Sequence, residues 1–174
     1  MQNKKVVETS KLDYYLVGIC GDVGHHVFIK EADNAYFLSL LKILLKDNEI
    51  VELAAYCLLN DRVDLLFYQV VSSGVAKFMH SIIVDYNKYY FDKYGVEDVL
   101  SEGRYKASKV LAKDILKESR KIHTNLDDWI NYRYSSLRAY LYNDTPDWLT
   151  KSHISDLYGS AVKYFDFLNS CDEE

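Results

Sequence analysis

Alternation of apolar and polar residues marks the segment around which this chain is organised, residues 56–68, with the sequence YCLLNDRVDLLFY. Its second half alternates Val63, Leu65 and Phe67 with Arg62, Asp64 and Leu66. A period of two is typical of a half-buried strand, and Asn60-Asp61 before it is typical of a tight turn, so a β-hairpin is predicted. Successive strand side chains point to opposite faces, so Arg62 and Asp64 share one face, about 6.6 Å apart. Exposed Arg–Asp pairs of this kind are common and contribute little to stability.

The segments on either side of the hairpin predict a first strand and two helices. Residues 14–20 are rich in β-forming side chains and read as a strand. Residues 31–46 read as a helix because apolar residues recur at spacings of three and four. Those residues are Phe37, Leu40, Leu41, Leu44 and Leu45. Ser72-Ser73-Gly74 predicts a turn and a helix cap, and the long helix that follows, 73–94, ends at Gly95.

Shorter elements are expected in the second half of the chain. Residues 111–125 read as a helix, and Ser135 is a suitable cap for a further helix. This order of elements predicts the α+β class. We expect a four- or five-stranded antiparallel sheet with the helices 31–46 and 73–94 on one face, in a ferredoxin-like arrangement, plus a C-terminal helical extension.

The length of 174 residues fits a single domain over residues 1–174. Its core is expected at about 12–125 and its helical extension at about 126–170. Only one proline and seven glycines occur, so no flexible linker is predicted. No apolar run approaches the ~20 residues of a membrane span, and no signal peptide is recognisable, so we expect a soluble, cytoplasmic protein without a membrane partner. Cys20 and Cys57 lie in strand-like runs and are expected to be buried thiols.

Charge is distributed unevenly along the chain, whose formal net charge is -5. Two acidic residues accompany seven basic ones in the middle of the chain: Arg104, Lys106, Lys109, Lys113, Lys117, Arg120 and Lys121. Such a run fits either a local phosphate-binding surface or a solvated helix face. The 16 tyrosines also fit two interpretations. Aromatic rings stack on unpaired bases, and they also fill protein cores.

The hairpin and the segments after it resemble the REP-associated tyrosine transposases, which are single-tyrosine enzymes of the His-hydrophobic-His nuclease group. The hairpin of that family typically reads like YVLMPNHVHLLL, and an ungapped comparison matches Tyr56 and Leu58. The two metal-binding histidines of the family fall on Arg62 and Asp64. The resemblance thus implies a nuclease fold with a degenerate metal motif, in which both ligand positions hold other residues.

The predicted long helix strengthens the resemblance. Its stretch MHSIIVDYNKYYFDKYG, residues 79–95, aligns without gaps with a family stretch like MQSLKRRYTRYFNRKYG. The coinciding residues are Met79, Ser81, Tyr86, Tyr89, Lys93, Tyr94 and Gly95. By this resemblance Tyr86 takes the position of the catalytic tyrosine. Where the family places a polar metal ligand one turn later, this chain has Tyr90 and Phe91.

Later segments match in order and spacing. LSEGRYK at 100–106 resembles the family's LWQGRFK, and by this resemblance residues 100–106 form a strand beside the active face. YSSLRAYL at 134–141 resembles YPWSSYRAYL. IHTN at 122–125 is an echo of the family's YIELNPVRAG. The resemblance extends over residues 12–168.

In the family, two histidines and a polar residue hold a divalent metal that polarises a phosphodiester of single-stranded DNA. The tyrosine hydroxyl attacks the phosphorus and forms a covalent phosphotyrosine link. Here Arg62 brings a fixed positive charge to one ligand position, and a single carboxylate at Asp64 is not a metal site. Arg62 is expected to pair with Asp64 or to contact phosphate. No metal or other cofactor is therefore expected, with Mg²⁺ or Mn²⁺ required only if the chain is an active enzyme.

Three functions follow as hypotheses. The first is a transposase-like DNA-binding protein whose catalysis is lost or impaired, with single-stranded or hairpin DNA held by Arg62, Arg104, Lys106, Lys109 and Lys113. The second is a domesticated protein-interaction module that binds no nucleic acid. The third is an active metal-dependent transposase that cleaves single-stranded DNA through Tyr86. A homodimer is an open alternative to a monomer in each case.

Overall fold

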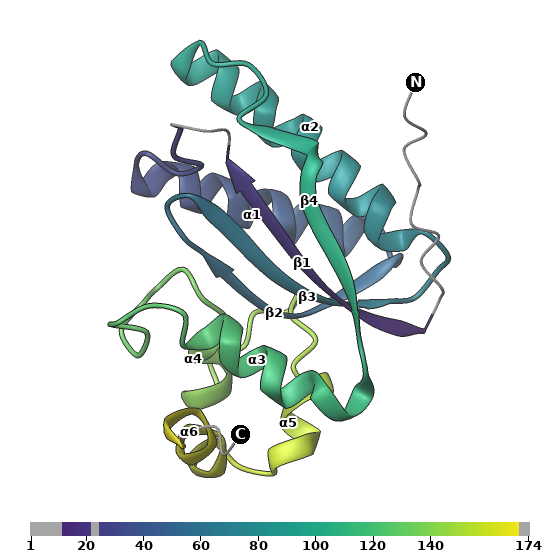
Figure 1. The fold of residues 1–174 in the computed structure, drawn as a ribbon, viewed down its shortest axis with the longest axis vertical. Coiled ribbons are helices and arrows are strands. Elements are labelled where there is room, and N and C mark those ends of the chain that lie inside the picture. Colours follow the sequence, from purple (N-terminus) through teal and green to yellow (C-terminus); the bar gives the residue numbers. More distant parts are fainter. Residues whose placement is uncertain (1–11, 22–24, 171–174) are drawn as a thin grey trace.

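The computed structural model describes residues 12–21 and 25–170, without the side chains of Glu102 and Arg104. Strands and helices alternate as β-α-β-β-α-β along the first two thirds of the chain (Figure 1). They are β1 (Asp13–Gly21), α1 (Glu31–Asp47), β2 (Val51–Leu58), β3 (Arg62–Gln69), α2 (Gly74–Tyr94) and β4 (Leu100–Val110). The strand order is β2-β3-β1-β4, and all neighbouring strands are antiparallel. This is the predicted ferredoxin-like arrangement of an α+β fold.

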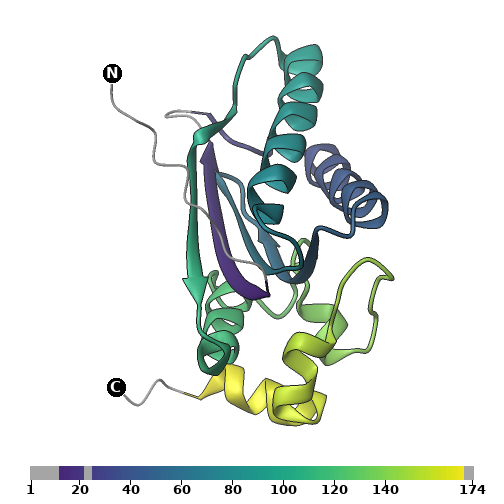
Figure 2. The same cartoon turned by 90° about the vertical axis from the view of Figure 1, so that its right-hand side faces the viewer.

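Helices α1 and α2 cover one face of the sheet (Figure 2). The odd-numbered side chains of β3 point toward them: the ring centroid of Phe67 lies 5.1 Å from that of Phe78 on α2. The even-numbered side chains, including Arg62 and Asp64, therefore point to the opposite face. We call that opposite face of the sheet the open face.

The β2–β3 hairpin turns at Asn60-Asp61, as predicted. Leu59 and Arg62 exchange backbone hydrogen bonds across these two residues, Leu59 N–H to Arg62 O over 2.8 Å and Arg62 N–H to Leu59 O over 3.3 Å. A two-residue loop fixes the register of both strands. It thereby fixes which side chains of β3 reach the open face.

The outer edge of β2 is covered by the segment 134–136, which lies far from β2 in the sequence. Leu58 N–H donates to Tyr134 O, and Ser136 N–H donates to Tyr56 O, each over 2.9 Å. This short antiparallel bridge satisfies backbone groups that an uncovered edge strand would present for pairing with other chains. The segment 134–136 is thus bonded to the sheet as a rudimentary outer strand.

Short helices follow β4 and gather at one end of the sheet (Figure 1). They are a 3₁₀ turn (Ala112–Asp114), α3 (Ile115–His123), α4 (Leu137–Leu141), α5 (Ser152–Tyr158) and α6 (Ala161–Asn169). Helix α3 packs against β2 and β3, and its C-terminal end reaches the open face. The predicted helix 111–125 is therefore shorter than expected, because the 3₁₀ turn takes up its first residues.

His123 joins separate parts of the helical extension. Its Nδ1 lies 2.8 Å from the Tyr164 hydroxyl and its Nε2 lies 2.7 Å from Ser136 Oγ. The Tyr164 hydroxyl donates in turn to Ser119 Oγ over 2.9 Å. Burial lowers the pKa of His123 to about 3, so the ring is neutral at pH 7.

The predicted cap of α2 is confirmed at its C-terminal end and is wrong at its N-terminal end. Gly95 ends the helix as predicted, with a left-handed φ of 69° that glycine adopts at little cost. The predicted serine cap at the start is wrong, because Ser73 makes no side-chain cap bond. Instead Gln69 Oε1 accepts the Val75 N–H over 2.9 Å, so a residue of β3 caps the helix.

The cysteines divide between core and surface. Cys57 is buried, as predicted, but Cys20 is exposed. Cys20 pairs across the sheet with Arg62 and so points to the open face, which explains its exposure. No helix in the described part of the chain combines the length and the apolar character that a membrane span requires.

Candidate nucleic-acid interface

A row of four residues crosses the open face, one from each strand. Lys106 of β4 pairs with Gly18 of β1, Gly18 pairs with Asp64 of β3, and Asp64 pairs with Cys57 of β2. Gly18 has no side chain, and Asp64 Oδ1 lies 3.5 Å from the position that a Cβ at Gly18 would take. Arg62 lies one position further along the same face.

Arg62 and Asp64 form an ion pair, which is one of the two roles expected for Arg62 from the sequence. Arg62 Nε donates to Asp64 Oδ2 over 3.1 Å, and Asn125 Nδ2 donates to the same oxygen over 3.1 Å. Burial raises the pKa of Asp64, although the guanidinium and the amide both favour the ionised form. Because the Arg62 side chain is 42% exposed, its terminal nitrogens can reach a ligand while Nε holds its orientation.

The residues at this point do not fit a divalent metal. The guanidinium of Arg62 brings positive charge to one of the two expected ligand positions, and the Asp64 oxygen already accepts two N–H groups. The neighbouring Cys57 thiol has its pKa raised to about 12 by burial, so it is protonated at neutral pH. Among the described residues, no three His, Cys, Asp or Glu side chains are placed to hold a metal ion. We therefore derive no step through a metal.

A groove of about 470 Å³ lies where the open face meets α3. Its floor includes Leu16 and Ser108, which pair across β1 and β4. Helix α3 contributes Lys117 and Lys121 to the wall. Lys121 is paired with Glu118 over 2.7 Å, whereas Lys117 makes no ion pair within the described residues. We call this the lysine groove.

The predicted DNA-binding residues do not all gather at the lysine groove. Lys106 points to the open face, and the exposed Lys113 lies in the 3₁₀ turn that leads into α3. Lys109 lines the lysine groove, but its Nζ is bonded to Asp13 over 2.8 Å, so its charge is already paired. The side chain of Arg104 lies outside the part that the structure describes.

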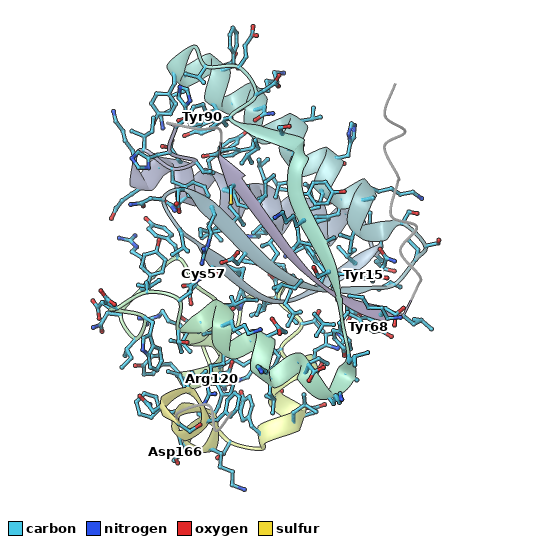
Figure 3. The ribbon with its side chains drawn as sticks, viewed as in Figure 1. Tyr15, Cys57, Tyr68, Tyr90, Arg120 and Asp166 are labelled. Carbon is cyan, nitrogen blue, oxygen red and sulfur yellow. The ribbon has the colours of Figure 1, made fainter. Side chains whose placement is uncertain are left out.

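Arg120 belongs to the basic run of the sequence, but its side chain is buried and does not contribute to a basic surface. It is only 8% exposed and lies between α3 and α6 (Figure 3). Its guanidinium donates to the backbone oxygens of Phe167 and Ser170 and lies 4.3 Å from the centroid of the Phe167 ring. Arg120 thus satisfies carbonyl groups at the C-terminal end of α6.

Tyr86, the predicted nucleophile position, lies on the other side of the sheet from Arg62 and Asp64. Its side chain is fully buried among aromatic rings, with the Phe37 centroid at 5.2 Å. Its hydroxyl donates to the backbone oxygen of Val27 over 2.6 Å. Burial strongly raises the pKa of Tyr86. The structure therefore does not bring Tyr86 together with the metal-motif positions.

The neighbouring tyrosines of α2 hold the segment between β1 and α1. Tyr90, labelled on α2 in Figure 3, donates to His26 O over 2.7 Å. Asp33 accepts hydrogen bonds from Tyr89 and Tyr94 and an ion pair from Lys93 at 2.6 Å. Burial raises the pKa of Asp33, but these donors outweigh it and lower the pKa to about 2. These tyrosines thus pack within the protein and hold the segment before α1 and the start of α1 in place.

Helix α5 closes one end of the open face through His153. Its Nδ1 lies 2.8 Å from the Tyr14 hydroxyl, and its Nε2 lies 2.5 Å from Glu52 Oε2. The ring also packs on Tyr68, with centroids 4.8 Å apart. Burial, with smaller contributions from Tyr68 and Glu52, raises the pKa of Tyr14. This cluster covers the end of the open face at Tyr14 and Tyr68 and leaves the region around Lys106, Gly18 and Arg62 outside it.

Sequence reasoning missed the role of Asn125. This residue is separated from Asp64 by 61 positions, and its amide also lies 3.6 Å from the Cys57 thiol. The only signal was the short IHTN match at 122–125, which placed Asn125 in a familiar segment without indicating its partner.

Comparison with known proteins agrees with the fold. A scan of protein-family models and a search of curated proteins found no match. Among solved structures, the chain is similar to a REP-associated tyrosine transposase bound to a REP hairpin, with a TM-score of 0.63, 10% identity, and coverage of 84% of this chain and 89% of that one. A bacterial tRNA(His) guanylyltransferase-like protein in complex with GTP reaches a TM-score of 0.43 at 13% identity, covering 82% and 73% of the two chains. The chain therefore shares the fold of the transposase.

Proposed function

We propose that this protein binds single-stranded or hairpin DNA on its open face and does not cleave it by a metal-dependent reaction. The observation that carries the proposal is the arrangement around Arg62. Asp64, itself held by Asn125, accepts the Nε–H of the guanidinium, and the 42% exposed Arg62 side chain lies on the same face of the sheet as Lys106. Guanidinium and ammonium groups on one surface are suited to neighbouring phosphates of a DNA strand.

The lysine groove extends this surface. Lys117 lines this groove, and Lys113 lies in the 3₁₀ turn that leads into the same helix, so both add positive charge near α3. The acidic net charge of the chain does not prevent local binding, because exposed charges further away than about 8–10 Å are largely screened at physiological salt. The solved transposase of the same fold was bound to a REP hairpin, which supports DNA hairpins as the first ligand to test.

The proposed loss of cleavage rests on two separate features. The pair of Arg62 and Asp64 does not fit a divalent metal, and the Tyr86 hydroxyl is buried and bonded to Val27 O. A nucleophile must reach the phosphorus within about 3–3.5 Å, and a fully buried hydroxyl does not offer that approach. The role of the fold is then to hold DNA without breaking it.

A binding and cleavage assay tests both parts. Fluorescence anisotropy would follow a labelled DNA hairpin, with an unstructured strand and a duplex of equal length as controls, at low and near-physiological salt. We expect preferential hairpin binding that weakens steeply with salt, because counterions are released from the phosphates. Absence of binding at both salts would contradict the proposal and favour a protein-interaction module. Nicking that requires Mg²⁺ or Mn²⁺ and is lost in Tyr86→Phe would instead establish an active transposase.

A further inference from the structure

A second pocket lies at the outer edge of β2, away from the lysine groove. It encloses about 400 Å³, which is within the usual range of small-molecule sites. Its lining comes from β2, from the segment 133–139 and from the segment 144–148. The bridge that joins Cys57 to Ser135 fixes these segments to the sheet, so the pocket is built on bonded backbone.

One wall of this pocket is aromatic. Tyr56 and Trp148 both line it, with ring centroids 5.6 Å apart and planes inclined by 29°. Tyr56 is only 7% exposed and supports Trp148 from the side of the sheet. A ring held in this way is preorganised to stack on a planar ligand, and such stacking contributes ~1–3 kcal/mol per nucleic-acid base.

The rim of the pocket is basic. Arg133 and Arg138 line it, against one carboxylate, Asp144. The contact of Arg133 with Glu31 is 3.3 Å long between side chains that are 65% and 73% exposed, so it holds Arg133 only weakly. Arg138 makes no ion pair within the described residues, and its guanidinium lies 5.4 Å from the Tyr142 ring centroid.

A buried hydroxyl completes the polar set. Ser135 is 4% exposed and lines the pocket. Its Oγ accepts the Leu137 N–H over 3.1 Å, and no acceptor for its own proton is found among the described residues. An acceptor atom from a ligand in the pocket would satisfy that donor.

We propose that this pocket binds one unpaired nucleotide, with the base against Trp148 and the phosphate between Arg133 and Arg138. A phosphate alone would leave the aromatic wall unused, and an apolar ring alone would leave Arg138 without an ion-pair partner among the described residues and Arg133 with only its exposed contact to Glu31. A nucleotide supplies both parts, and guanidinium forks bind phosphate oxygens in pairs. The site is independent of the open face, since it lies at the other edge of the sheet from β4.

Tryptophan fluorescence tests this directly, because the chain has two tryptophans. In a Trp129→Phe background only Trp148 reports. We expect dAMP to quench this emission saturably, and deoxyadenosine to do so at least tenfold more weakly because it lacks the phosphate. Arg138→Gln and Arg133→Gln should each weaken dAMP binding about tenfold or more, with circular dichroism confirming the fold. Arg62→Gln, on the open face, is the matched control and should leave dAMP affinity unchanged.

Either of two results would overturn the proposal. One is the absence of saturable quenching by dAMP at millimolar concentration. The other is equal quenching by dAMP and deoxyadenosine that neither arginine variant alters, which would indicate ring contact without phosphate recognition. Failure of hairpin binding by the wild-type chain would leave dAMP quenching intact, so the two proposals fail separately.

Discussion

The hydroxyl of Tyr86 donates a hydrogen bond to the backbone oxygen of Val27 over 2.6 Å inside the layer between α2 and the sheet. This relationship ties the tyrosine helix to the segment that precedes α1. It gives the tyrosine a structural role at the position where the resemblance implies a nucleophile.

The first prediction concerns this bond. Tyr86→Phe removes the donor and leaves the Val27 oxygen unsatisfied in the core, so unfolding free energy should fall by ~1–3 kcal/mol. Urea denaturation measures the change. Hairpin affinity of the folded variant should equal that of the wild type, and a selective loss of DNA binding or cleavage without loss of stability would contradict the structural role.

The second prediction concerns the cations of the open face and the lysine groove. The variant Lys106→Gln/Lys113→Gln/Lys117→Gln should bind the hairpin more weakly and show a smaller dependence of log affinity on log salt. Each lost phosphate contact reduces that slope by ~0.7–0.9, so three contacts reduce it by about 2. Lys42→Gln/Lys77→Gln/Lys88→Gln is the matched control, because it removes the same charge from exposed positions on α1 and α2, which cover the other face of the sheet. Equal losses in both variants would show a nonspecific charge effect.

The third prediction concerns Asp33, which is fully buried and bonded to Lys93. Its pKa is lowered to about 2, so the ionised form stabilises the fold above pH 4. Stability from this group should fall as the pH drops from about 4 to 2, by on the order of 2 kcal/mol. Asp33→Asn should remove that part of the pH dependence and destabilise the protein already at pH 7. If Asp33→Asn lost stability between pH 4 and pH 2 by as much as the wild type does, the lowered pKa of Asp33 would not be the cause of that loss.

The fourth prediction concerns His123, whose pKa burial lowers to about 3. The unfolded chain binds a proton on this ring near pH 6.5, whereas the folded chain keeps it neutral. Stability should therefore be full above pH 6.5 and decline as the pH falls toward 3. Replacement by Gln should flatten this decline, which a series of denaturation curves between pH 7 and 4 would measure. If unfolding free energy depended on pH in the same way in the wild type and in His123→Gln, the buried neutral His123 would not explain the decline.

The sequence predicted the elements of the fold better than the contacts of the site. The hairpin turn at Asn60-Asp61 and the glycine end of α2 at Gly95 follow from local periodicity and turn chemistry, whereas the strand at 100–106 is implied only by the family resemblance. The pairing of Arg62 with Asp64 could also be predicted, because both residues lie on one strand. These features need no knowledge of distant segments.

Partners far apart in the chain could not be predicted in this way. Asn125 meets Asp64 across 61 positions, and Ser135 reaches the edge of β2 from the far end of the chain. The periodicity of α2 places Tyr86 on its apolar stripe, but it does not tell whether the hydroxyl meets solvent or Val27. The charge of Arg120 favours a surface position, and the sequence does not show that α6 covers it.

The most direct test of the account is lysine footprinting with and without a DNA hairpin. Acetylation rates of individual lysines, read by mass spectrometry at near-physiological salt, report which face the DNA covers. We expect protection of Lys106, Lys113 and Lys117, with Lys42 and Lys88 on α1 and α2 unchanged. Protection confined to Lys42 and Lys88, or no protection of any lysine at saturating hairpin, would contradict binding on the open face.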